Sequence, residues 1–108
     1  MKYKDVANNK EINAYLKKGN SNLGQLGFTD HSQAHCVQVA HQAGKILKRF
    51  GYSEHEIELA KIAGYMHDIG NAINRTHHAE YGALLANELL KDTDMTLEDR
   101  ITVVSAIG

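Results

Sequence analysis

The stretch that decides the fold runs from Ile62 to Asn74 and reads IAGYMHDIGNAIN. It is apolar or small almost throughout, and its only acidic or basic side chains are the adjacent His67 and Asp68. Such a run is expected to lie in the interior, where a carboxylate is costly unless something pairs with it. An imidazole beside a carboxylate in that setting most simply indicates a metal ion.

The bulk composition is that of an ordinary soluble protein. The chain has 108 residues, of which 43% are hydrophobic and 23% are charged, and this length predicts one domain that spans residues 1–108. The formal net charge is −1, and lysine and arginine are spread evenly along the chain. The charge pattern therefore predicts neither nucleic acid nor a membrane as a partner.

The compartment can be predicted from the N-terminal residues and from cysteine usage. The first residues lead into polar sequence without the apolar core of a signal peptide, and no window approaches the roughly 20 apolar residues of a membrane span. The single Cys36 cannot form an internal disulfide. We therefore expect a cytoplasmic protein, with Cys36 as a small core residue.

Helical spacing without strand-type alternation predicts an all-α fold of about five helices. The chain has no proline to interrupt them. We expect Gly19 to end the first helix, Thr29 or Asp30 to cap the second, and Ser53 with Glu56 to form a capping box for the third. The expected helices cover approximately residues 9–18, 29–50, 54–69, 77–91 and 96–108.

Three of the seven histidines are expected to face the interior, because each shares a helical row with apolar or small residues. The rows are His35 with Val39, Ala43, Ile46 and Phe50; His67 with Ala60, Ala63 and Gly64; and His78 with Gly82, Leu85 and Leu89. The small residues before His67 would let a neighbouring helix approach closely. His41 and His55 lie on polar rows and are expected at the surface.

Several converging polar groups in an interior all need partners, and one cation satisfies them together. The spacing therefore predicts a metal site formed by His35, His67, Asp68 and His78. The row of Asp68 begins with the charged Glu58. For this reason, the alternative that Asp68 belongs to a solvated face stays open.

Three segments resemble the HD-domain superfamily of metal-dependent phosphohydrolases. They are residues 29–35 (TDHSQAH), 63–71 (AGYMHDIGN) and 78–85, and the resemblance extends over residues 28–108. It implies an all-helical bundle in which His35, His67 and Asp68 bind a first metal and His78 binds a second. The cofactor would be one or two divalent ions of Mn, Fe, Co, Ni or Zn.

The resemblance also implies a reaction. The metal would lower the pKa of a bound water, and the resulting hydroxide would attack a small phosphorylated substrate, such as a nucleotide, with Asp68 at the centre of the catalytic site. His31 would either support the metal ligands or face the substrate, and Arg75, Lys61 or His77 would contact the substrate phosphate. An ordinary surface position is the alternative for Arg75 and for His77.

Two alternatives to the hydrolase remain, namely a non-catalytic metal- or ligand-binding module and a di-iron oxygenase. The family pattern continues with a further His and a final Asp, which would fall after Gly108, so we expect the chain to be the N-terminal part of a family domain without its last helix. The apolar row of Leu97, Ile101 and Val104 is then expected to lack a cover within the chain. Such a face favours a homodimer or marginal stability.

Overall fold

The computed structural model describes residues 1–27 and 32–108, which form six α-helices and one short 3₁₀ helix. These are α1 (Tyr3–Ala7), α2 (Lys10–Gln25), α3 (Gln33–Arg49), α4 (Glu54–Met66), η1 (Ile69–Ala72), α5 (His78–Leu90) and α6 (Leu97–Ile107). No strand occurs in these two ranges, and the all-α prediction is confirmed. The helices α1 and η1 were not expected from the sequence.

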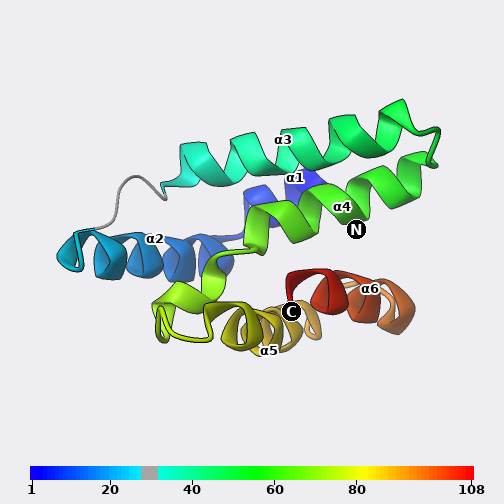
Figure 1. The fold of residues 1–108 in the computed structure, drawn as a ribbon. Helices are drawn as coiled ribbons and strands as arrows, with labels where there is room; N and C mark the ends of the chain where they lie inside the picture. The colour runs from blue at the N-terminus through cyan, green and yellow to red at the C-terminus, as the bar shows by residue number, and fades with distance from the viewer. Residues whose placement is uncertain (28–31) are drawn as a thin grey trace.

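The helices form two pairs joined by η1. Figure 1 shows α3 and α4 side by side as a hairpin, with α5 and α6 as a second pair beside it. The end of α4 continues into η1, which packs against both α2 and α5. The central stretch of the sequence therefore lies where α2, the hairpin and the second pair meet.

This central stretch forms much of the core. Ile62, Tyr65, Met66 and Ile69 are fully buried. The hydroxyl of Tyr65 donates to Asn13 Oδ1 at 2.7 Å and accepts from the side-chain amide of Gln33 at 2.9 Å, which ties α2, α3 and α4 together. Burial raises the pKa of Tyr65 above its ordinary value. The buried phenol is therefore neutral and can make both bonds.

The prediction that Gly19 ends the first helix is wrong, because α2 continues to Gln25. A Cβ at Gly19 would lie 3.2 Å from the main-chain nitrogen of Ala72 and from Cβ of Asn71. The glycine thus allows η1 to approach the side of α2. Its small size serves packing here and not helix termination.

The predicted capping box at the start of α4 is confirmed. The side chain of Ser53 accepts from the main-chain N–H of Glu56, whose carboxylate in turn accepts from the main-chain N–H of Ser53. Thr29 and Asp30 lie outside the described residues, and α3 begins after Ser32 in the N-cap position.

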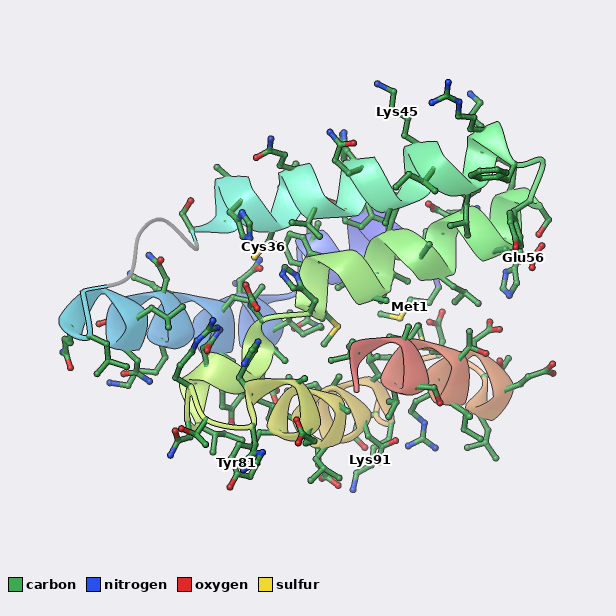
Figure 2. All side chains as sticks on the ribbon, in the orientation of Figure 1. Met1, Cys36, Lys45, Glu56, Tyr81 and Lys91 are labelled. Atoms are coloured by element: carbon green, nitrogen blue, oxygen red, sulfur yellow. The ribbon has the colours of Figure 1, made fainter. Side chains whose placement is uncertain are left out.

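The apolar row assigned to His35 is only partly correct. Ile46 and Phe50 are 53% and 74% exposed, because the buried face of α3 is the one that carries Cys36, Ala40 and Gly44. Cys36 is 1% exposed, so its predicted place in the core is confirmed. In Figure 2, Cys36 points inward from α3, whereas Lys45 points away from the bundle.

The last helix leaves part of its apolar surface uncovered, as predicted for Leu97 and Ile101, whereas Val104 is half-buried. Leu97 and Ile101 are 61% and 56% exposed, whereas Val103 and Ile107 face the core. Within residues 1–27 and 32–108, no helix combines the length and apolar character needed to cross a bilayer.

Candidate metal centre

The close packing of α3 on α4 brings His35 and His67 together. A Cβ at Gly64 would lie 3.2 Å from the main-chain oxygen of Val39, so the two backbones touch at this point, as the small row before His67 predicts. His35 lies one helical turn before Val39, and His67 follows Gly64 by three residues. As a result, the rings of the two histidines are 5.7 Å apart, centroid to centroid.

The approach of η1 to α5 brings His78 to the same place. A Cβ at Gly70 would overlap the main-chain carbonyl of His78 and lie 2.6 Å from the main-chain nitrogen of Gly82. Only a glycine permits this contact. Because Asp68 immediately precedes η1, the contact sets His78 beside Asp68.

Asp68 lies at the centre of this cluster. Its Oδ2 is 3.1 Å from Nε2 of His67 and 3.8 Å from Nε2 of His35, and its Oδ1 is 3.5 Å from Nε2 of His78. Asp68 is 8% exposed, so the alternative that it belongs to a solvated face is wrong. The three histidine side chains are 30–35% exposed. The carboxylate is therefore at the base of the cluster and the imidazoles are at its rim.

Hydrogen bonds to the main chain orient two of the imidazoles. The Nδ1–H of His67 donates to the carbonyl of Gly64 at 2.7 Å, and the Nδ1–H of His78 donates to the carbonyl of Arg75 at 3.2 Å. Both bonds turn Nε2 toward Asp68. Partners of this kind commonly fix the tautomer of metal-binding histidines.

Asp68 also controls the protonation of its neighbour. Its hydrogen bond raises the pKa of His67 above the ordinary 6.5, against burial, which lowers it. In turn, the side-chain amide of Asn71 donates to the main-chain oxygen of Asp68 at 3.0 Å and holds the turn that carries the carboxylate.

The donor set fits a divalent transition metal. Two atoms that bind one ion at about 2.1 Å each lie roughly 3.0–3.5 Å apart. The separations of 3.1, 3.5 and 3.8 Å around Asp68 are close to this range. Ligand atoms of His35, His67 and Asp68 all lie within 4.8 Å of one another. Imidazole and carboxylate donors together suit Mn, Fe, Co, Ni or Zn.

The other predicted site residues lie in different surroundings. Arg75 lines a pocket together with Asn71 and Asn74, and its main-chain oxygen accepts from Nδ1–H of His78. His77 points to solvent, with its side chain 67% exposed and its ring 3.1 Å from Glu80. His31 lies outside the described residues. His41 and His55 are exposed, as predicted.

Sequence reasoning missed Asn71, Gly70 and Asn22 as residues that support the site. The side-chain amide of Asn22 donates to the main-chain oxygen of Asn71 at 3.0 Å and so joins α2 to η1. The sequence placed Asn22 in a loop because Gly19 suggested a helix end. Asn71 carried a usable signal, since a polar side chain in a buried run needs a partner.

Comparisons with known proteins show which sequences this chain is similar to. A family model described as the HD domain matches residues 33–107. Uncharacterized protein MJ1020 of Methanocaldococcus jannaschii is 31% identical over 107 residues, which cover 85% of this chain and 41% of that protein. No solved structure matches the chain.

Two further relatives are ribonucleases. Ribonuclease Y of Bacillus pumilus is 40% identical over 73 residues, which cover 61% of this chain and 14% of the ribonuclease. Ribonuclease Y 1 of Pediococcus pentosaceus is 32% identical over 93 residues, which cover 80% and 16% of the two chains. The chain thus spans less than half the length of the curated relatives it matches.

Proposed function

We propose that this chain, which belongs to the HD domain family, is a metal-dependent phosphohydrolase that cleaves a phosphate ester. The observation that carries the proposal is the convergence of His35, His67 and His78 on the two oxygens of Asp68. Helices far apart in sequence supply these side chains, and packing or hydrogen bonds orient them. That arrangement is expected of a binding site and is costly without a ligand.

The two carboxylate oxygens divide the cluster into two parts. Oδ2 faces His35 and His67, and Oδ1 faces His78. We assign the first group to one metal and His78 to a second, with Asp68 as the shared ligand. A divalent metal bound there supplies Lewis acidity, which lowers the pKa of water and offsets charge on phosphoryl oxygens. The chain itself supplies the negative charge of Asp68 and the fixed direction of each Nε2.

Arg75 is the better candidate for contact with the substrate phosphate. Its main-chain oxygen accepts from Nδ1–H of His78, which places this residue next to a member of the cluster, and Arg75 also lines a pocket with Asn71 and Asn74. A planar guanidinium matches two phosphate oxygens at once. His77, in contrast, is held at the surface beside Glu80. We therefore assign to His77 at most a weaker, peripheral contact.

Metal content and phosphatase activity, measured together, test the proposal. We expect the purified chain, loaded with Mn, Fe or Zn, to hold metal and to hydrolyse p-nitrophenyl phosphate. The His67→Ala/Asp68→Ala variant should lose both properties. The His55→Ala variant should keep both, because His55 is exposed and pairs with Asp99 at 2.9 Å. Circular dichroism establishes that each variant is folded.

Three outcomes would overturn this assignment. Metal binding that survives in the His67→Ala/Asp68→Ala variant would place the site elsewhere. Metal binding by the unchanged chain without turnover of any phosphate ester would favour the non-catalytic module. Oxygen consumption by the iron-loaded chain would favour the oxygenase instead.

A second candidate function is cleavage of RNA phosphodiesters, and similarity to ribonuclease Y proteins favours it. The even charge distribution predicts no nucleic-acid partner, and that prediction stands against this candidate. Hydrolysis of a short oligoribonucleotide, compared with hydrolysis of a monoester under the same conditions, separates the two functions. Loss of RNA cleavage in His35→Ala would assign that activity to the cluster.

We also propose that the protein works in the cytoplasm. The support is chemical: Cys36 is a free, buried thiol, and no disulfide joins the described residues. A fluorescent fusion found mainly outside the cytoplasm would contradict this proposal.

A further inference from the structure

A hollow between α3 and α4 lies toward the end of the hairpin where the two helices are connected. Its volume is about 430 Å³, within the range of about 300–1,000 Å³ that is usual for sites that hold a small molecule. Three ammonium groups and one carboxylate belong to its lining. The charged, polar and apolar side chains that form it include His41, Lys45 and Lys48 from α3 and Glu54, Ile57 and Lys61 from α4.

The charges on α3 are all of one sign. From Gln33 to Arg49 the helix contains no acidic residue, and its charged side chains are Lys45, Lys48 and Arg49. None of these three forms an ion pair with another of the residues that the structure describes. Cations in the last turn of a helix are favourable, which accounts for Lys48 and Arg49 but not for Lys45. The helix therefore presents unpaired positive charge beside the hollow.

Gly44 brings a further cation to this part of α3. A Cβ at Gly44 would lie 2.7 Å from Cε of Lys61, so the aliphatic part of the Lys61 side chain lies across α3 where the glycine leaves room. The ammonium of Lys61 is 3.7 Å from Glu58, and the side chain stays 31% exposed. Because Gly44 directly precedes Lys45, the contact sets the Lys61 side chain next to the segment that carries the unpaired cations.

Lys45 and Lys48 also line a second hollow, of about 550 Å³, together with Arg49. Figure 2 shows that Lys45 points away from the bundle, as expected for a side chain that stands between two hollows. Long lysine side chains keep their charged ends in water, so these charges are available to a ligand at little cost. An anion with several charged oxygens can contact more than one of them at once.

We propose that the hollow between α3 and α4 is a second binding site, for a small, multiply charged anion that carries phosphate groups. A phosphate group has more than one negative charge near neutral pH, and lysine binds it as a point charge. Lys45 and Lys48 contact the anion, with Lys61 beside them. Glu54 repels it, so the anion lies on the α3 side of the hollow.

This site is separate from the metal cluster. Lys45 follows His35 by ten residues on the same helix, which corresponds to about 15 Å along the helix axis. The inference therefore does not depend on the proposed hydrolase function. A free anion and a lipid headgroup share the chemistry, and the concave shape between two helices favours the free anion.

Tripolyphosphate, added to the metal-free chain, tests the site. We expect it to shift the main-chain amide signals of Gly44, Lys45 and Lys48 in a ¹H–¹⁵N spectrum. Calorimetric titration should give a Kd that rises with added NaCl, because salt screens exposed charges. Lys45→Gln/Lys48→Gln should raise this Kd about tenfold, as expected for the loss of two partly exposed ion pairs. Lys10→Gln/Lys18→Gln is the matched control, since it removes two exposed cations of α2 that lie outside both hollows.

A third variant separates charge from structure. Lys45→Arg/Lys48→Arg keeps both charges, and arginine and glutamine favour helix about as well as lysine does. The arginine variant should bind tripolyphosphate as the unchanged chain does, and circular dichroism should show the same helix content for all variants.

Three results would overturn the proposal. The first is an equal Kd for Lys45→Gln/Lys48→Gln and the Lys10→Gln/Lys18→Gln control. The second is a set of shifts confined to residues around the metal cluster. The third is binding to phosphatidylglycerol vesicles that Lys45→Gln/Lys48→Gln loses, without any binding of tripolyphosphate, which would assign this face to a membrane surface instead.

Discussion

Replacement of Gly70 by alanine tests whether the contact between η1 and α5 builds the metal cluster. The new methyl group would overlap the main-chain carbonyl of His78 and lie 2.6 Å from the main-chain nitrogen of Gly82. Ordinary contacts begin at 3.4 Å, and neither partner is a side chain that can rotate away. The N-terminal end of α5 must therefore retreat from η1 by at least about 0.8 Å, since a packed interior cannot absorb the overlap.

The expected loss of stability follows from two opposed effects. Overpacking of this kind costs about 1–3 kcal/mol. Replacement of a glycine by alanine also reduces the conformational entropy of the unfolded chain, which stabilises the folded state by about 0.4–1 kcal/mol. This gain is smaller than the cost of overpacking. We expect a net loss near 1.5 kcal/mol and a Tm lower by about 7 °C in a domain of this size. The retreat of α5 also increases the 3.5 Å separation of His78 from Asp68, and metal binding should weaken at that position.

Thermal unfolding and calorimetric titration with Mn²⁺ measure the two effects. Gly24→Ala is the matched control, because a Cβ at Gly24 meets nothing within 4 Å. Alanine inside a helix is favoured over glycine by up to about 1 kcal/mol, so this variant should be as stable as the unchanged chain or slightly more stable. If Gly70→Ala unfolds at the same temperature as Gly24→Ala and binds Mn²⁺ equally well, the contact does not position His78.

Four further predictions concern the cluster and the surface. The pKa of His67 is raised above 6.5, so the metal-free chain should have a higher free energy of unfolding than His67→Gln at low pH. This difference should be complete below pH 6.5 and should disappear as pH rises through the raised pKa. Equal unfolding free energies of the two chains at all pH values would contradict this. Chelation of a metal present at 100 times its Kd should lower the free energy of unfolding by about 2.7 kcal/mol and lower Tm by at least about 10 °C. The Tm of His67→Ala/Asp68→Ala should not change on chelation. Arg75→Met should raise KM for a phosphate ester about tenfold, as expected for a lost charge-assisted hydrogen bond, whereas His77→Ala should change KM little. Light scattering should show a dimer that Leu97→Glu/Ile101→Glu converts to a monomer, and a monomeric unchanged chain would refute the predicted homodimer.

Features that depend only on residues close together in the chain could be predicted from the sequence. Ser53 and Glu56 are three residues apart, and their capping box needs no distant partner. The adjacency of His67 and Asp68 in an apolar run similarly indicated a buried carboxylate. Their pairing, at 3.1 Å, depends on little more than the turn that follows α4.

Most contacts between distant segments could not be predicted from the sequence, although the small row before His67 did predict the approach of α3 to Gly64. Two other glycines show why. Gly19 and Gly70 both permit a close approach of another backbone, at η1 and at α5. A glycine that ends a helix and one that permits such an approach look the same in a sequence. Misreading Gly19 as a helix end also hid Asn22, since an asparagine in a loop has no evident partner 49 residues away.

His35 was selected for a reason that the structure only partly supports. The row that made it look interior includes Ile46 and Phe50, which are exposed, because α4 packs on a different face of α3. His35 reaches Asp68 because it lies near the start of α3, where the hairpin meets η1. Helical periodicity thus finds residues that share a face, but the neighbouring helix decides which face is buried. For a half-buried residue near the end of a helix, such as His35, the position along the helix axis matters as much as the helical row.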